Sequence, residues 1–229
     1  MYVSGLQKLT LLDFPQVVSC IVFTQGCNFR CPFCHNSTLV EGEPEEEIST
    51  EKIFEFLKKR KGLLDGVVIT GGEPLIQKDI RGFVEKLKEM GYLVKLDTNG
   101  TNPKMLKELV EAELIDYVAI DIKNSPEEYD KATGVTGLMD KVTESKDFLI
   151  KGTVPYEFRT TVVKGIHTKE SLVTLAKWIK GAEHYFLQQY KDSGSILSPA
   201  GLSPFSEAEM KEFLTEILPI IPTAKIKNL

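Results

Sequence analysis

Six short apolar segments alternate with amphipathic stretches along this chain of 229 residues, and the alternation limits the fold more than any other feature. Each segment is built around apolar residues, as are strands buried on both faces of a parallel sheet. They cover residues 18–24, 66–70, 93–98, 117–122, 158–163 and 185–189. Alternating strands and helices build a parallel sheet with right-handed crossovers, so the fold class is α/β. Periodicity leaves open whether the sheet is doubly wound or an incomplete barrel.

The stretches between the strands have apolar residues at helical spacing. Helices are expected around residues 53–57, 80–87, 106–110, 172–179 and 206–218. Ser206 begins the last of these, and Glu209 three residues later completes a capping-box pattern. Gly91 is a stop signal after the second helix.

Length and charge set further limits. The chain fits one α/β domain, so a single domain is expected over residues 1–229. The formal charge of −5 and a pI near 5.4 argue against a nucleic-acid partner. The sequence has no apolar run of membrane-spanning length, and its start lacks a signal-peptide pattern, so we expect a cytoplasmic protein without membrane contact. The acidic segment 42–47 is expected to form a solvated loop.

Unusual polar residues follow most of the predicted strands directly. They lie at 25–27, 70–74, 97–100, 121–123 and 188–191. The carboxyl ends of parallel strands meet at one rim, where α/β proteins bind ligands, so the sequence predicts a site there. Arg159 fits less well, because it lies near the start or middle of its strand.

Cys27, Cys31 and Cys34 crowd into the loop after the first strand, whereas Cys20 lies inside an apolar run and is expected in the core. Clustered cysteines in a cytoplasmic protein indicate metal or redox chemistry. One interpretation is a zinc site with His35 as fourth ligand, although a second paired Cys-x-x-Cys is missing. The other is a [4Fe–4S] cluster whose fourth iron has no protein ligand, an open position of the kind that catalytic metals need.

The spacing C-x3-C-x2-C, with Phe33 before the last cysteine, resembles the signature of radical S-adenosylmethionine (SAM) enzymes. The sequence Gly-Gly-Glu-Pro at 71–74 is similar to the GGE motif of that family. The resemblance implies a partial (β/α)6 barrel of the TIM type, with a [4Fe–4S] cluster on Cys27, Cys31 and Cys34 in the loop 26–36. It further implies that SAM binds the open iron and is cleaved to a 5′-deoxyadenosyl radical.

The resemblance also implies contacts with SAM. Phe33 is expected against the adenine, or else packed on the core. Gly71 and Gly72 let the main chain approach the methionine moiety closely. The other expected contacts are Glu73, Pro74, Asp97, Thr98, Asn99 and Lys123. Arg159 is expected either to pair with the SAM carboxylate or to point into solvent.

Within this superfamily the chain most resembles the activating enzymes of glycyl-radical proteins. The stretches GLQKLTLLDFP, FTQGCNFRCPFCHN, DTNG and DIK carry this resemblance. It implies abstraction of a glycine Cα hydrogen in a larger partner, with flavodoxin or ferredoxin as electron donor. The Gly-Leu-Gln-Lys start favours anaerobic ribonucleoside-triphosphate reductase as that partner.

Asp97 and Asp121 match the aspartates that bind a monovalent cation in pyruvate formate-lyase activators. Those activators carry a histidine where this chain has Gln189-Tyr190-Lys191, which puts pyruvate formate-lyase in doubt as the partner. His167 and His184 are expected on loops or at the surface. Three alternatives stay open: a pyruvate formate-lyase activator, a radical SAM enzyme for a small molecule such as the carboxydeazaguanine synthases, and a zinc-stabilised binding protein.

Overall fold

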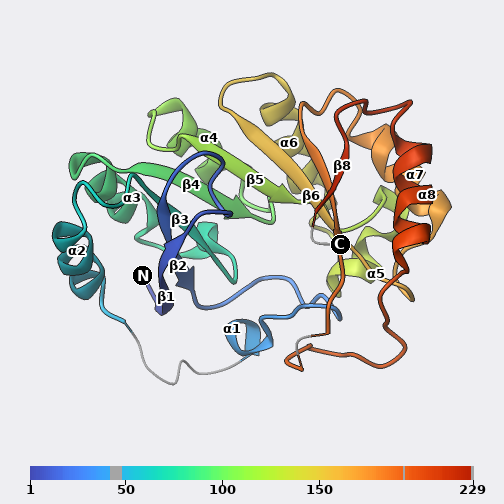
Figure 1. Cartoon of the computed structure of the whole chain (residues 1–229), viewed down its shortest axis with the longest axis horizontal. Helices are drawn as coiled ribbons and strands as arrows, with labels where there is room; N and C mark the ends of the chain where they lie inside the picture. The colour runs from blue at the N-terminus through green and yellow to red at the C-terminus, as the bar shows by residue number, and fades with distance from the viewer. Residues whose placement is uncertain (42–47, 193, 228–229) are drawn as a thin grey trace.

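The computed structural model describes residues 1–41, 48–192 and 194–227, so the predicted loop at 42–47 lies outside the described residues. An eight-stranded sheet with the strands in chain order dominates the fold (Figure 1). Strand β1 (Val3–Thr10) pairs antiparallel with β2 (Ser19–Thr24), and every later pair is parallel.

The six predicted strands are β2 to β7. The last five of these are β3 (Gly66–Gly71), β4 (Leu93–Thr98), β5 (Tyr117–Asp121), β6 (Tyr156–Val162) and β7 (Tyr185–Gln189). The prediction missed the two edge strands, β1 and β8 (Lys225–Lys227). Strand β1 carries Gly, Gln and Lys with exposed positions, and β8 has three residues, so neither has the apolar run of a buried strand.

The predicted helices are also present. They are α2 (Thr50–Lys59), α3 (Ile80–Glu89), α4 (Pro103–Glu111), α7 (Lys169–Trp178) and α8 (Glu207–Ile217). The capping box that begins α8 is formed, with Ser206 and Glu209 bonding reciprocally. Three helices were not predicted: α1 (Ser37–Glu41), α5 (Tyr129–Thr133) and α6 (Met139–Ile150). Helix α6 buries Ser145 and Lys146, and these polar residues hide its apolar face in the sequence.

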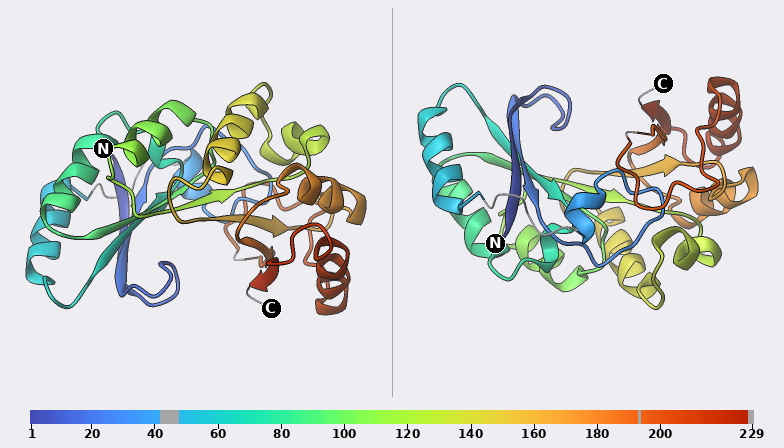
Figure 2. Two further views of the ribbon diagram at one scale, coloured as in Figure 1. Left: turned by 90° about the horizontal axis from the view of Figure 1, so that it is seen from above. Right: turned by 90° about the horizontal axis from the view of Figure 1, so that it is seen from below.

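The sheet is a curved, unclosed barrel. Helices lie along its outer face (Figure 2), where their apolar residues and those of the strands form the main core. Cys20 is fully buried in this core, as predicted. A smaller apolar cluster of Phe14, Ile21 and Val68 lies apart from it. Among the described residues no ladder joins β1 to β8, so the structure confirms the partial barrel.

Candidate active site

The cysteine loop after β2 is held from several sides. Gly26 N–H donates to the Leu39 carbonyl (2.7 Å), and Arg30 N–H donates to the Thr133 carbonyl at the end of α5 (2.7 Å). The Cys34 carbonyl accepts from Leu197 N–H (3.0 Å). Segments far apart in the sequence therefore fix the loop that carries the three thiols.

Asn28 adds a side-chain link that the sequence did not reveal. Its amide donates to the Thr101 hydroxyl (2.8 Å), and its carbonyl oxygen accepts from the Asn99 amide (2.8 Å). Cys27 Sγ accepts from Phe29 N–H at 3.4 Å. Side-chain hydrogen bonds thus join the end of β4 to the cysteine loop. The only sign of this link in the sequence is the amide side chain of Asn28, which lies between two cysteines.

The glycine turn after β3 packs directly on the base of the cysteine loop. Gly72 N–H donates to the Thr24 carbonyl (2.9 Å), and Glu73 N–H donates to the Gly26 carbonyl (2.7 Å). Gly71 has φ +116°, which favours glycine, and a Cβ on Gly72 would overlap the Gly26 carbonyl. Both glycines are therefore required by close main-chain contact.

Glu73 is fully buried and joins the ends of β3 and β4. Its carboxylate accepts from the Thr98 hydroxyl (2.6 Å) and from Asn99 N–H (2.7 Å). Burial raises the pKa of Glu73 to about 7, against the opposing effect of these hydrogen bonds. Glu73 and Pro74 do not line the cavity described below, so the structure places them behind the glycine turn.

A row of alternating charges runs across the inner face of the sheet. Arg159, from the middle of β6, donates to Asp121 (Nε, 2.9 Å) and to Asp97 (Nη1, 3.1 Å). Lys95 pairs with the other Asp97 oxygen at 2.5 Å, and Lys123 with the other Asp121 oxygen at 3.3 Å. Arg159 lies beside Asp121 because β5 and β6 pair these residues in register.

This row of charges bears on two predictions, the orientation of Arg159 and the monovalent cation site. Arg159 points inward and lines the cavity instead of reaching into bulk solvent. Despite burial, its positive charge holds the pKa of Asp97 and of Asp121 below the usual range of a carboxyl group. The guanidinium lies between the two aspartates, and a monovalent cation at Asp97 and Asp121 stays a prediction.

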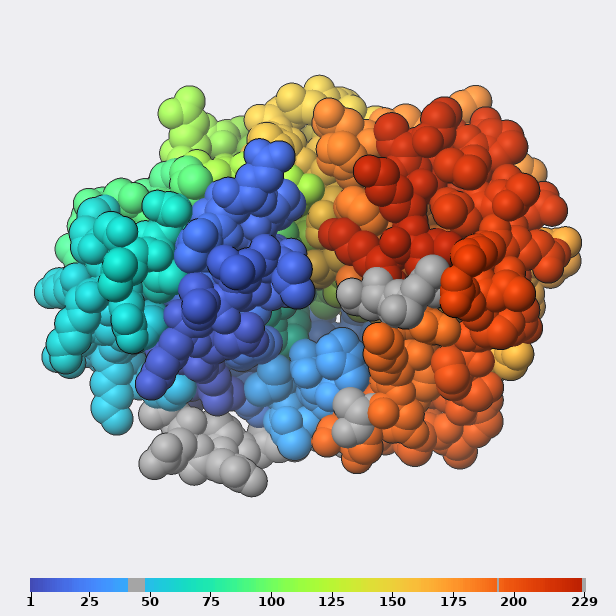
Figure 3. Space-filling model, viewed as in Figure 1, coloured from blue at the N-terminus to red at the C-terminus, as the bar shows by residue number. Residues whose placement is uncertain are grey.

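One cavity of about 340 Å³ collects most of the predicted site residues. This volume is within the range of small-molecule sites. It is lined by Cys27, Cys31, Phe33, Cys34, Gly71, Gly72, Asp97, Thr98, Asn99, Asp121, Lys123 and Arg159. Gln7 and Asp13 of the β1–β2 hairpin also line it, as does Gln188 of β7. Figure 3 shows the surface hollowed between this hairpin and the C-terminal segment.

Without a metal, burial keeps the thiols of Cys27 and Cys31 protonated. Burial raises the pKa of Cys27 to about 11 and that of Cys31 to about 12. Lys123 acts in the opposite direction on both. Thiolates are the metal-binding form, so cluster assembly here releases protons and is favoured by the positive charge of Lys123.

His167 lies in the loop between β6 and α7, as predicted, but it is buried there, whereas His184 is an exposed loop residue. Val163 N–H donates to His167 Nδ1 (3.1 Å), which leaves the proton on Nε2, facing the Lys123 carbonyl (2.8 Å). Its ring also meets Phe33 edge-on, at a centroid distance of 6.1 Å. His167 thus connects the lysine and the aromatic residue of the site.

His167 predicts an acid-sensitive stability. Burial lowers its pKa to about 4, whereas an unfolded histidine titrates near 6.5. The unfolded state therefore binds more protons between these values, and stability falls as pH drops through them. We expect His167 to lower the free energy of unfolding by about 2 kcal/mol when the pH falls from 7 to 5. Glu73, whose raised pKa falls in the same pH window, acts in the opposite direction, so the contribution of His167 is measured as a difference between variants. In urea unfolding at both pH values, the wild type should lose about 2 kcal/mol more stability than His167→Gln. His184→Gln serves as the control, and an equal pH effect in both variants would contradict the assignment.

Three thiols and a glycine turn face one cavity at the carboxyl ends of the strands of a partial barrel. This donor set fits a cubane cluster, because each thiolate of such a cluster binds a different iron. Within the described ranges no three His, Cys, Asp or Glu side chains converge to hold a single metal ion. The fold and site together define a barrel enzyme with a cluster beside a small-molecule pocket.

Comparison with known proteins identifies the family. Residues 21–179 match the radical SAM superfamily. A Methanocaldococcus jannaschii protein named as a glycyl-radical enzyme activating enzyme is 36% identical over 82% of this chain and 80% of its own length. The pyruvate formate-lyase-activating enzyme of Clostridium pasteurianum is 26% identical over 84% and 83% of the two chains. The protein belongs to the radical SAM superfamily.

Solved structures agree on the fold. Streptococcus suis SuiB has a TM-score of 0.72 at 14% identity over 91% of this chain, which spans about half of the SuiB chain. A domain of a pyruvate-formate lyase-activating enzyme from Bacteroides vulgatus has a TM-score of 0.57 at 17% identity, over 71% of this chain and 99% of that one. As a superfamily member, the protein is an enzyme that uses a [4Fe–4S] cluster and SAM. In the described part of the chain no helix is long and apolar enough to cross a bilayer.

Proposed function

We propose that the protein is an activating enzyme that removes a Cα hydrogen from a glycine of a larger partner protein. The observation that carries the proposal is its 36% identity to a protein named for this role, over about four fifths of each chain. When bound, the cluster and SAM supply a 5′-deoxyadenosyl radical, which abstracts the hydrogen. Glycine suits this chemistry, because no side chain blocks its Cα.

The residues of the chain hold and enclose the reactants. Cys27, Cys31 and Cys34 would hold the cluster. Gly71 and Gly72 let the main chain approach the methionine part of SAM, and Arg159 offers a fork of donors for its carboxylate. Asp97, Thr98, Asn99 and Lys123 complete the polar wall of the cavity. No step in this scheme requires a side chain to move a proton, so a catalytic acid or base is unnecessary.

The open side of the barrel supports a macromolecular partner. Gln7 and Asp13 of the β1–β2 hairpin line the cavity, and the same hairpin exposes Leu9, Leu11 and Leu12 at 56%, 66% and 90%. Large exposed apolar groups at the mouth of a site indicate a contact surface. We propose that the partner packs on these leucines while its glycine segment enters the cavity.

The finer assignment is anaerobic ribonucleoside-triphosphate reductase as partner, with flavodoxin or ferredoxin as electron donor. Two sequence features support the choice of partner. Residues 5–8 have the Gly-Leu-Gln-Lys pattern, and Gln189, Tyr190 and Lys191 stand where pyruvate formate-lyase activators carry a histidine. Gln189 is also engaged internally, because its amide donates to the Phe205 carbonyl (2.7 Å).

The direct test is to reconstitute the enzyme anaerobically with iron and sulfide and to mix it with SAM, reductant and each candidate partner. Electron paramagnetic resonance should show a glycyl radical on ribonucleotide reductase and none on pyruvate formate-lyase. SAM cleavage without a radical on either protein would favour a small-molecule substrate. A colourless protein with bound zinc and no SAM cleavage would reject the enzyme assignment altogether.

The exposed leucines of the β1–β2 hairpin give a separate prediction. The double variant Leu11→Ser/Leu12→Ser should weaken the apparent affinity for the partner by at least about tenfold, because burying each leucine is worth about 1.5–3 kcal/mol. SAM cleavage without partner should not change. The control is Leu218→Ser, a partly exposed leucine that follows α8. Equal activation by both variants would show that the hairpin does not contact the partner.

A further inference from the structure

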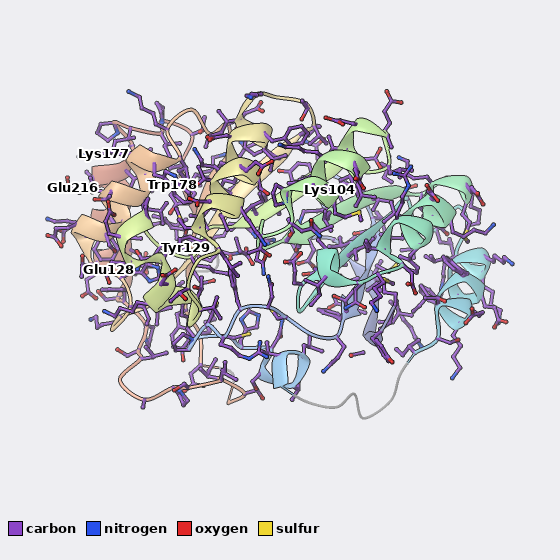
Figure 4. The ribbon with its side chains drawn as sticks, turned by 180° about the vertical axis from the view of Figure 1, so that it is seen from behind. Lys104, Glu128, Tyr129, Lys177, Trp178 and Glu216 are labelled. Atoms are coloured by element: carbon purple, nitrogen blue, oxygen red, sulfur yellow. The ribbon has the colours of Figure 1, made fainter. Side chains whose placement is uncertain are left out.

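Tyr129 carries a buried hydroxyl whose proton has no acceptor among the described groups. It is the first residue of α5 and is 1% exposed, and the main-chain N–H of Lys123 lies near its oxygen. Its ring lies edge-on to Phe29 (centroids 6.3 Å apart) and to Trp178 (6.0 Å). Figure 4 labels Tyr129 on α5 and Trp178 at the end of α7. A phenylalanine would make the same ring contacts without desolvating a hydroxyl, so packing alone does not explain a tyrosine here.

The position of Tyr129 ties it to the cysteine loop. Phe29, its ring neighbour, lies between Cys27 and Cys31, and Cys31 is 6% exposed. Arg30 N–H donates to the Thr133 carbonyl at the other end of α5 (2.7 Å). Helix α5 is therefore attached to the cysteine loop at two neighbouring residues, Phe29 and Arg30.

The surroundings of the hydroxyl keep its proton in place. Burial raises the pKa of Tyr129 above its usual value and Cys31 raises it further, while the charge and the main-chain N–H of Lys123 act in the opposite direction. The hydroxyl therefore keeps its proton at physiological pH and is available as a hydrogen-bond donor. A thiol sulfur is a weak hydrogen-bond acceptor, whereas a thiolate bound to iron carries negative charge.

We propose that the Tyr129 hydroxyl donates a hydrogen bond to a sulfur of the bound cluster, either the Cys31 thiolate or a sulfide beside it. One-electron reduction adds negative charge to the cluster, so a donor at sulfur stabilises the reduced form more than the oxidised form. Hydrogen bonds to the sulfurs are among the factors that set cluster potentials. Tyr129 is thus a positioning residue that makes the cluster easier to reduce. The inference rests on the cluster of the superfamily and is independent of the glycyl-radical partner.

The test is a redox titration of the reconstituted holoenzyme, with the reduced cluster followed by electron paramagnetic resonance. Tyr129→Phe should lower the equilibrium constant for one-electron reduction about tenfold, which corresponds to a potential about 59 mV more negative. Tyr185→Phe is the matched control, because Tyr185 is a buried tyrosine whose hydroxyl already bonds the Thr160 hydroxyl (3.0 Å). An unchanged potential in Tyr129→Phe, or the same shift in Tyr185→Phe, would overturn the proposal.

A second measurement separates this role from a structural one. In urea unfolding of the full chain purified without cluster, Tyr129→Phe should be as stable as the wild type or more stable, because it removes an unsatisfied buried hydroxyl. A less stable variant would mean that the hydroxyl supports the fold, and the proposal would fail. Neither measurement uses a partner protein, so a failure of this proposal can be told apart from a failure of the proposed function.

Discussion

Arg159→Met should destabilise the protein by about 3 kcal/mol, measured as the free energy of unfolding in urea. The substitution leaves two carboxylates of the inner face, Asp97 and Asp121, without the cation that lies between them. Removing one partner of a buried ion pair typically costs about 3–5 kcal/mol. The low end applies because the side chains of Asp97 and Asp121 are only partly buried (12% and 35% exposed) and because Lys95 and Lys123 still pair with them.

Two further variants make the Arg159 result specific. Arg159→Lys keeps the charge but cannot bridge both aspartates with a planar fork, so it should recover only part of the loss. Arg81→Met removes an exposed pair with Glu85 (2.8 Å) on α3 and should change stability by at most about 0.5 kcal/mol. If Arg159→Met unfolded at the same urea concentration as Arg81→Met, the ion pairs of Arg159 with Asp97 and Asp121 would contribute no more to stability than an exposed pair.

Gly72→Ala should reduce SAM cleavage by about a hundredfold, because displacements near 1 Å in a site cost about that much. The new methyl group would collide with the Gly26 carbonyl at the base of the cysteine loop. Either that loop or the β3 turn must shift, and both line the cavity. The measurement is the rate of 5′-deoxyadenosine formation in reconstituted protein with matched iron content.

Gly82→Ala is the matched control for this variant. Gly82 lies inside α3, and a Cβ there would meet no atom within 4 Å. Alanine should therefore be neutral or stabilising by up to about 1 kcal/mol, since glycine is the poorer helix former. Equal activity of the two variants would show that the contact of Gly72 with Gly26 does not position the site.

The sequence predicted the elements whose residues share one clear pattern. Strands β2 to β7 are built around apolar residues, and the Gly, Asp and Asn residues of the site lie at the ends of β3, β4 and β5 or directly after them. Helix α6 escaped prediction because Lys146 and Ser145 lie on its buried side. Local pattern is thus informative only where burial and polarity agree.

The contacts missed in the site are those set by distant main chain or by strand register. His167 bonds the main chain of Lys123, which is 44 residues away, and no local pattern marks that contact. Arg159 meets Asp121 only because β5 and β6 align these residues. The ring of Tyr129 contacts Phe29 of the cysteine loop because α5 folds back against Arg30. Such neighbours follow from the assembled sheet and not from the spacing of residues.

An unclosed sheet has two edges, each a template for aggregation with another chain. At the first edge, the pairing of β1 with β2 is irregular at Val3–Gly5 and Gln7–Thr10, which hinders the addition of a further strand. The second edge, β8, is only three residues long, and Lys225 and Lys227 occupy its ends. Short strands, bulges and lysines are the usual protection against strand addition. The barrel can therefore stay open for a substrate while its edges resist the self-association that would block the opening.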